Sequence, residues 1–247
     1  MWKRVYPAGR TLLFSSPLSA YQQRTISSWE FNESSNAPRM DSRAANHLTD
    51  NNTVPTVSGV ATNDTFAASF TAGNFEFLSR SAGTISGIEN KSDNFSIEVA
   101  FKINATGIGQ TIIAKGATSN TIPGFWLQIQ TSNRLQITLG NGTSRVSVNP
   151  TNVLTTSTLY HVICTFDRTG NMAMYINNVA GTGTSSASIA GITGSLGAST
   201  DLTIGQTSSV TYMSGDVGFV RVWDGLLDAT DRSYLYNSGA LRSYEQL

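Results

Sequence analysis

The chain has 247 residues, enough for one large all-β domain with a sizeable core or for two smaller domains. Charged residues are only 13% of the total, and 16 Lys and Arg balance 16 Asp and Glu. This balance excludes the strongly basic face that nucleic-acid binding favours and the polybasic patch that binds anionic lipids. We therefore expect no nucleic-acid and no membrane partner, and no apolar run reaches the roughly 18 residues of a membrane-spanning helix.

The N-terminus carries a short basic and apolar stretch. Basic residues precede a brief apolar run within residues 3–14, as in a signal peptide, but Ser15-Ser16-Pro17 interrupts the run. We therefore expect no secretion signal. We interpret residues 1–26 as an N-terminal arm in front of one domain over residues 27–247.

Short predicted strands follow from residue 28 onward. Residues 95–103 show the clearest pattern, because their odd positions are apolar whereas Ser96, Glu98 and Lys102 face the other way. Further strands are predicted at 28–32, 66–70, 75–78, 111–114, 125–130, 135–139, 145–148, 202–204 and 217–223. Gly, Asn, Ser or Pro separates nearly every pair, which is typical of a β-sandwich or jelly roll.

The segment 159–179 predicts a β-hairpin. Apolar and polar residues alternate over 160–166, and a loop containing Gly and Asn leads into a second alternating run at 172–177. The single cysteine, Cys164, falls on the apolar set and is interpreted as a small buried side chain. His161 points to the opposite face of the strand.

One helix is predicted near the C-terminus. Asp228 can cap its start, Asp231 follows three residues later, and Gly239 can end it. Residues 180–200 are small and polar without a period, so we interpret them as a long loop or an irregular edge.

Several segments, taken in order, resemble the laminin-G-like and pentraxin-like jelly rolls of the concanavalin A-like class. They are WEFNESSNAPRMDSRAANHLTDN, AASF with FEFLS, NFSIEVAFKI, LYHVICTFD, MAMYINNV, and DLTIGQ with MSGDVGFVRVWDGLLDATD. The resemblance runs from Ser28 to about Gly239 and leaves residues 1–26 outside. It implies an antiparallel β-sandwich jelly roll with an N-terminal arm and one short C-terminal helix, and a binding or structural module rather than an enzyme.

The closing strand departs from this resemblance at Gly218-Phe219, where many family members have Asp-Glu. In the family that Asp often helps to bind calcium or anchors the first loop, so we expect no metal and no other cofactor here. Scattered carboxylates that calcium could use are Asp41, Asp50, Asp201 and Asp216. We interpret these four as ordinary turn residues.

The sequence shows no catalytic constellation. Glycoside hydrolases with this type of fold need two carboxylates that flank the sugar bond, and related glucanases carry them as Glu-x-Asp-x-x-Glu on one strand. None of the six glutamates of this chain has a carboxylate two residues away. His47 and His161 are far apart, and neither a metal-binding His/Cys spacing nor a Gly-x-Ser-x-Gly turn occurs. We therefore predict no catalytic residues.

Carbohydrate binding is the chemistry that the sequence supports best. Lectins stack an aromatic face on the sugar ring and bind its hydroxyls with amide side chains. Trp126 is predicted on the strand face opposite the apolar residues and beside Gln128, Asn141 lies in a Gly-Asn-Gly turn, and Tyr212 lies in a loop. These four are the candidate ligand-binding residues. In the competing interpretation, Trp126 packs under a loop or into a subunit contact.

Together these features predict a non-enzymatic virion surface protein, a bacteriophage capsid decoration or fibre-type component that displays a lectin-like sandwich. Residues 1–26 are expected to contact sister subunits in a homo-oligomer or other virion proteins, and glycans are the expected ligands of the sandwich. Two alternatives stay open. One is a secreted or surface-attached carbohydrate-binding protein, and the other is a glycoside hydrolase or polysaccharide lyase of the same fold.

Overall fold

The computed structural model describes residues 18–33, 35, 37–88, 92–116, 121–197, 199–207 and 211–247. It also gives the backbone of two short antiparallel strands, β1 (Arg4–Val5) and β2 (Thr11–Leu12). The other residues of the expected N-terminal arm before residue 18 lie outside the described residues.

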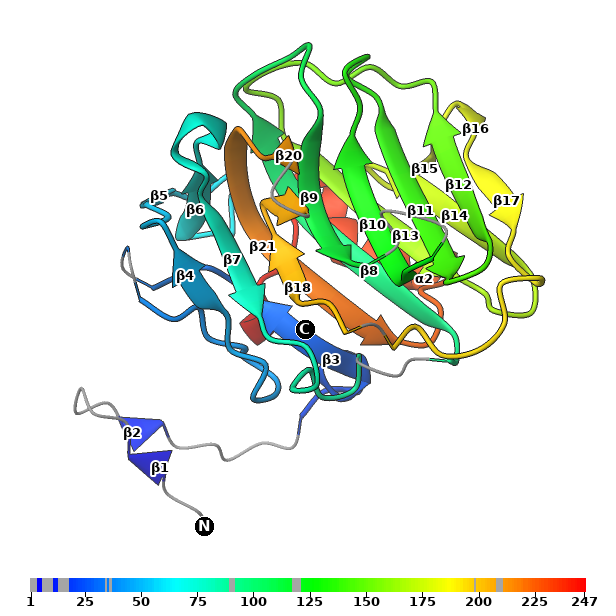
Figure 1. Cartoon of the computed structure of the whole chain (residues 1–247). Helices are drawn as coiled ribbons and strands as arrows, with labels where there is room; N and C mark the ends of the chain where they lie inside the picture. The colour runs from blue at the N-terminus through cyan, green and yellow to red at the C-terminus, as the bar shows by residue number, and fades with distance from the viewer. Residues whose placement is uncertain are drawn as a thin grey trace.

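Two antiparallel sheets stack face to face (Figure 1). The eight-stranded sheet contains, in spatial order, β16 (Gly183–Thr184), β12 (Arg145–Pro150), β11 (Leu135–Asn141), β10 (Pro123–Ile129), β9 (Gln110–Lys115), β18 (Leu202–Ile204), β7 (Phe77–Arg80) and β4 (Thr49–Asn51). The nine-stranded sheet contains β15 (Val179–Ala180), β14 (Asn171–Ile176), β13 (Tyr160–Phe166), β8 (Phe95–Ile103), β21 (Gly215–Asp224), β6 (Phe66–Phe70) and β5 (Thr56–Ser58), with β17 (Ser186–Ser188) on β14 and β3 (Thr25–Trp29) on β21. The predicted antiparallel β-sandwich jelly roll is confirmed.

The hydrophobic core lies between the two sheets. The odd residues of β8 are all buried there, as the alternation predicts. Phe95 of β8 stacks on Phe166 of β13 with 4.1 Å between ring centroids, and it also contacts Phe125 of β10 in the other sheet. Cys164 is buried in the same cluster, and this burial raises the pKa of its thiol. The cysteine therefore packs as an apolar side chain, as the sequence indicates.

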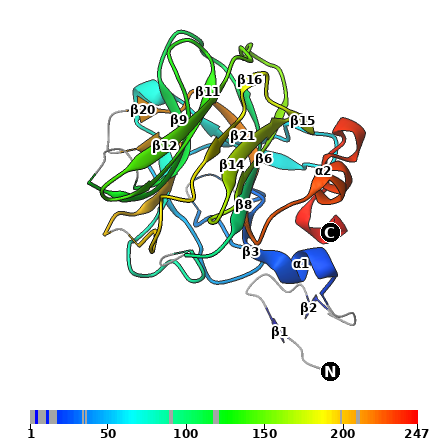
Figure 2. The same ribbon diagram turned by 90° about the vertical axis from the view of Figure 1, so that its right-hand side faces the viewer.

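A second layer covers the outer face of the nine-stranded sheet. It contains α1 (Ala20–Arg24), α2 (Ala229–Tyr236) and the 3₁₀ turns η2 (Asn237–Gly239) and η3 (Tyr244–Gln246) (Figure 2). Tyr21 of α1 stacks on Tyr234 of α2 at 4.4 Å and meets Trp223 of β21 edge-on at 6.4 Å. The beginning and the end of the sandwich therefore meet on one face of the molecule.

Helix α1 was missed by the sequence analysis, and it falls within the residues assigned to the arm. Ser19 caps it in a reciprocal capping box with Gln22, but the helix has only five residues, too few for an apolar period. Residues 25 and 26 begin β3, whose register places Thr25 beside Trp223. Residues 20–26 are thus built into the sandwich.

Helix α2 begins where it was predicted to begin and ends before its predicted end near Gly239. The Asp228 side chain accepts a hydrogen bond from the Asp231 N–H at 2.8 Å, and the Asp231 side chain accepts one from the Asp228 N–H at 3.1 Å. The predicted end near Gly239 is wrong, because Asn237 adopts a left-handed conformation at φ 47° and closes the helix after Tyr236.

Residues 180–200, interpreted as a long loop or an irregular edge, form an irregular edge, because β16 is the terminal strand of its sheet. Strand β16 pairs with β12 of one sheet, whereas β17 pairs with β14 of the other, so this segment crosses between the sheets. Its small side chains carry no alternation, and tertiary contacts with the neighbouring strands supply the pairing.

Candidate functional site

Trp126 lies in an outward-facing row across the eight-stranded sheet. It pairs with Thr138 on β11, and Thr138 pairs with Ser147 on β12. Its chain neighbours Phe125 and Leu127 are buried in the core. The alternation of β10 therefore turns the indole to the outer face, where it is partly exposed.

The polar neighbours of Trp126 hold it in place. Gln128 lies on the same face opposite Gln136, and its Nε2 donates a hydrogen bond to the Gln136 Oε1. The indole Nε1 donates to the Thr111 Oγ1 at 3.1 Å, and the hydroxyls of Thr111 and Thr211 are 2.7 Å apart. These bonds order the side chains before a ligand arrives, which reduces the entropy lost on binding. We call Trp126, Gln128, Gln136, Thr138 and Ser147 the outer-face platform.

Tyr212 lies apart from Trp126, across a separate hairpin. It belongs to β20 (Thr211–Tyr212), which pairs with β19 (Gln206–Thr207), and both strands pack beside β9. The Tyr212 ring contacts Phe75 at 5.2 Å and Phe77 at 6.4 Å between centroids. The hairpin links it to the platform, because Thr211 contacts Thr111, the partner of the Trp126 indole.

Asn141 lies at the turn between β11 and β12, where its side chain serves the backbone. Its Oδ1 accepts hydrogen bonds from the N–H groups of Thr143 and Ser144 at 3.1 and 2.9 Å and from the Thr143 hydroxyl at 3.0 Å. Such an Asx turn satisfies local donors and fixes the loop. Of the four candidates, the structure therefore brings together Trp126 and Gln128, and it places Tyr212 and Asn141 elsewhere.

A connected group of charged side chains lies on the opposite sheet. Arg221 of β21 binds both oxygens of Glu30, with Nε and Nη2 at 2.9 and 3.1 Å, and its Nη1 is 3.3 Å from both oxygens of Glu98. Glu98 also contacts the His161 Nε2 at 2.9 Å and the Trp223 Nε1 at 3.1 Å. We call Glu30, Glu98, His161 and Arg221 the buried charge network.

Burial and pairing set the charge states in this network. Burial alone would raise the pKa of Glu98, but the Arg221 guanidinium and the His161 contact outweigh it and hold that pKa below its ordinary value. Burial alone would lower the pKa of Arg221, and the carboxylates of Glu30 and Glu98 reverse this effect and raise it. Both groups are thus ionised and satisfied, which indicates a structural role under the second layer.

Asp64 occupies the space above Gly218, the position at which the sequence departs from the family. A Cβ atom at Gly218 would lie 2.2 Å from the Asp64 Oδ2 and 2.5 Å from a Val60 methyl group. This carboxyl oxygen is buried without a hydrogen-bond partner. Burial, followed by the Glu30 carboxylate, raises the pKa of Asp64 to about 7. A carboxyl from the loop before β6 thus fills the place that a side chain on the closing strand would take.

The four aspartates considered for calcium all accept hydrogen bonds, and the interpretation of Asp50 and Asp216 as turn residues is wrong, because they lie in β4 and β21. Their partners are the Ser28, Arg43 and Asn46 amides for Asp41, the Arg39 guanidinium and Val54 amide for Asp50, the Ala82 amide for Asp201 and the Ser69 hydroxyl for Asp216. Within the described ranges, no group of three or more His, Cys, Asp or Glu side chains could hold a metal ion. No described helix is long and apolar enough to cross a membrane.

The outer-face platform offers a neutral surface of one aromatic ring, two amides and the half-buried hydroxyl of Ser147, which bonds to the buried Thr138 hydroxyl at 2.8 Å. The negative face of an indole attracts weakly positive C–H groups, and amides and hydroxyls donate to and accept from ligand hydroxyls. The platform itself has no carboxylate that could act as an acid or a base. This combination suits a ligand that presents C–H groups on one side and hydroxyls at its edges.

Comparison with known proteins agrees with this fold. The family model described as the concanavalin A-like lectin/glucanases superfamily, of the laminin G type, matches residues 77–231. The chain belongs to this family. No curated protein matches the chain in sequence.

Solved structures of clostridial toxin domains have the same fold. The binding domain of Paraclostridial Mosquitocidal Protein 1 superposes with a TM-score of 0.69 at 11% identity, over 89% of this chain and 53% of that one. The botulinum neurotoxin serotype D ligand binding domain, in complex with N-acetylneuraminic acid, superposes with a TM-score of 0.65 at 16% identity, over 89% of this chain and 52% of that one. The botulinum neurotoxin DC binding domain, in complex with rat synaptotagmin II, superposes with a TM-score of 0.60 at 18% identity, over 89% of this chain and 52% of that one. The family member therefore spans about half the length of each of these domains.

Proposed function

We propose that this family member is a non-enzymatic carbohydrate-binding protein and that the outer-face platform is its binding surface. The observation that carries the proposal is the partly exposed Trp126 indole, held by Thr111 and flanked by the paired amides of Gln128 and Gln136. Exposed aromatic rings beside ordered amides match the two sides of a sugar, its C–H groups and its hydroxyls. The complex of the serotype D toxin domain with a sugar acid supports the same ligand class for this fold.

The distribution of carboxylates supports a role in binding without turnover. Hydrolysis of a glycosidic bond needs two carboxyl groups on either side of it. Glu30 and Glu98 are both bound to the Arg221 guanidinium, and Glu98 is fully buried in the nine-stranded sheet. The platform lies on the opposite sheet, and its side chains are neutral.

We further propose that the N-terminal arm attaches the sandwich to a larger assembly, such as a virion surface. Helix α1, near the end of the arm, packs against the outer face of the nine-stranded sheet, opposite β9 and β11 (Figure 2). An arm that attaches on that side would leave the outer-face platform turned outward. A secreted or surface-attached carbohydrate-binding protein would use the same platform without such an attachment.

The test is a glycan array followed by calorimetric titration of the oligosaccharide that binds best. Trp126→Ala is expected to weaken binding about fivefold or more, because one stacked ring contributes about 1 kcal/mol or more. Val179→Ala, an exposed change on β15, should leave the affinity unchanged. The same sugar should be recovered intact after incubation with the protein. Cleaved sugar, or full affinity in Trp126→Ala, would contradict the proposal.

A further inference from the structure

Phe75 is an exposed aromatic residue in an unusual backbone conformation. Its φ and ψ are 58° and 36°, the left-handed region, and 58% of its surface is exposed. Bulky residues rarely adopt this conformation, because their Cβ atom crowds the backbone. Gly or Asn would fill the position with less strain, and the exposed ring adds no burial to the core.

The loop around Phe75 is built to hold this conformation. Glu76 is buried, and its carboxylate accepts hydrogen bonds from the Thr71 N–H at 2.6 Å and the Asn74 Nδ2 at 3.0 Å, across the turn η1 (Ala72–Asn74). The Asn52 Nδ2 donates to the Phe75 carbonyl at 2.8 Å. Strained residues persist where their surroundings fix them, and they gather at binding sites.

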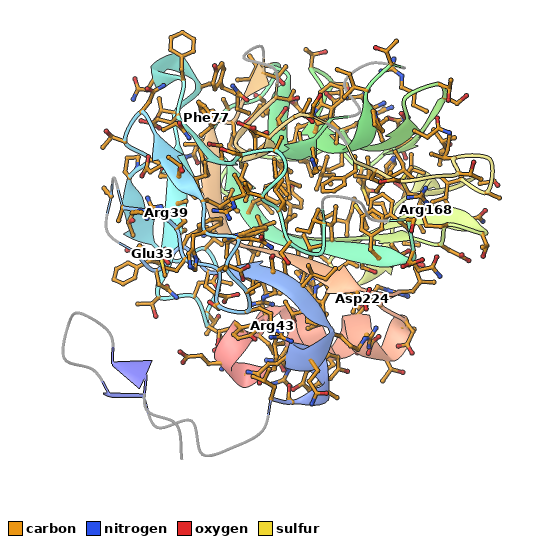
Figure 3. The ribbon with its side chains drawn as sticks, turned by 60° about the horizontal axis from the view of Figure 1, so that its bottom comes forward. Glu33, Arg39, Arg43, Phe77, Arg168 and Asp224 are labelled. Atoms are coloured by element: carbon orange, nitrogen blue, oxygen red, sulfur yellow. The ribbon has the colours of Figure 1, made fainter. Side chains whose placement is uncertain are left out.

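Phe75 forms a cluster with two other aromatic residues. Its ring meets the Tyr212 ring at 76°, and Tyr212 meets Phe77 at 61°, so in each pair the edge of one ring meets the face of the other. Phe77 lies on the side of the molecule away from the C-terminal helices (Figure 3). We call Phe75, Phe77 and Tyr212 the aromatic rim. In each such pair, the ring that presents its edge keeps both of its faces free of that partner, and free ring faces attract C–H groups.

The aromatic rim is linked to the outer-face platform by a chain of side-chain hydrogen bonds. Trp126 bonds to Thr111, Thr111 contacts Thr211, and Thr211 precedes Tyr212 in β20. In the sheet, β10 and β7 are three strand positions apart, roughly 14 Å at the usual spacing of about 4.8 Å. That span exceeds a single sugar ring, and the polar side chains beside the rim, Asn51 and Ser79, are neutral.

We propose that the aromatic rim is a second binding subsite, which stacks a sugar ring of the same oligosaccharide that covers Trp126. The inference rests on the proposed carbohydrate function. It adds that the ligand is an uncharged oligosaccharide of several sugars running across the strands. The strained Phe75 holds its ring in position for the distal sugar.

The test titrates the wild type, Phe75→Gly, Trp126→Ala and Val179→Gly with a length series of the oligosaccharide selected on the array. Phe75→Gly should weaken binding of the long oligosaccharides roughly fivefold and leave short fragments unaffected. Its melting temperature should equal or exceed that of the wild type, because Gly accommodates the left-handed conformation. Asparagine also adopts the left-handed conformation readily, so Phe75→Asn should show the same loss of affinity. Val179→Gly should bind normally.

The outcomes separate this inference from the proposed function. If no glycan binds the wild type, both proposals fail. If Trp126→Ala weakens binding but Phe75→Gly and Phe75→Asn bind long oligosaccharides normally, only the aromatic rim is overturned. If both Phe75 variants unfold at lower temperature, the ring has a structural role and the rim is again overturned. Binding to phosphatidylcholine vesicles that is lost in Phe75→Gly would assign the rim to a lipid surface instead.

Discussion

Arg221 compensates the negative charges of Glu30 and Glu98 beneath the second layer. Its guanidinium is fully buried, donates to Glu30 and Glu98 and to the Arg242 carbonyl at 2.6 Å, and lies 3.8 Å from the centre of the Phe219 ring. Removing one member of such a network leaves its partners buried and uncompensated, which costs more than the network contributes.

Arg221→Met should therefore lower the free energy of unfolding by about 3–5 kcal/mol. Urea unfolding of this variant beside Arg134→Met, an exposed arginine, measures the effect. The double variant Glu98→Gln, Arg221→Met should recover part of the loss, because it also removes the Glu98 carboxylate that Arg221→Met leaves without its cation. A single variant as stable as the wild type would contradict the structural role of the network.

Asp64 should make stability depend on pH. Its folded pKa of about 7 lies above the ordinary value of 3.8, so the folded state holds a proton that the unfolded state has released. The protein therefore loses stability as the pH rises from about 4 to 7, by about 4 kcal/mol, and the loss levels off above pH 7.

Asp64→Asn should remove this loss, because the amide does not ionise. The stability of the variant relative to the wild type is expected to increase between pH 4 and pH 7 and to stay constant at higher pH. Urea unfolding across this range measures the difference. A difference that does not change with pH would show that Asp64 titrates normally in the folded protein.

At the scale of elements, helix α2 holds the second layer against the sheet. Its Asp228 caps the first turn, and Asp231 also pairs with Arg24 of α1 at 2.9 Å. Asp228→Ala should lower the free energy of unfolding by about 1 kcal/mol, because the first turn loses its cap. Thr230→Ala, an exposed change in the same turn, should have little effect in the same thermal unfolding experiment. Equal stabilities would refute the capping role.

Elements with strong local signals were the ones that the sequence predicted well. Strand β8 was predicted with its observed bounds, 95–103, because its alternation has no exception on the core face. Strands β15 to β17 and helix α1 are too short or too small in their side chains to carry a period, and their partners come from distant segments. The left-handed Asn237 likewise decided the end of α2, where the sequence favoured Gly239.

The candidate site was only partly visible in the sequence. The alternation of β10 placed Trp126 and Gln128 on one face, but Gln136 and Thr111 come from other strands and depend on the register of the sheet. Phe75 was predicted to begin a strand at 75–78, and this start is wrong, because Phe75 adopts a left-handed conformation after η1 and β7 begins at Phe77. Glu98 was assigned to the face opposite the core, but its burial depends on the C-terminal segment that covers that face.

At the scale of the whole molecule, helix α1 determines how many N-terminal residues can be removed without loss of stability. A chain beginning at Leu18 retains α1, its Tyr21 stack and the Arg24–Asp231 ion pair, whereas one beginning at residue 27 loses all three. The first should melt like the full chain, and the second should lose about 2 kcal/mol or more. Both should lose assembly if the arm attaches the sandwich, as light scattering would show. A Leu18 chain that still forms the full assembly would contradict the role of the arm.

The most direct test of the central claim is the crystal structure of the protein with the oligosaccharide that binds best on the array. We expect sugar density over the Trp126 ring, with sugar hydroxyls within hydrogen-bonding distance of Gln128 and Gln136. Sugar bound at another face, with the Trp126 ring uncovered, would contradict the proposed binding surface.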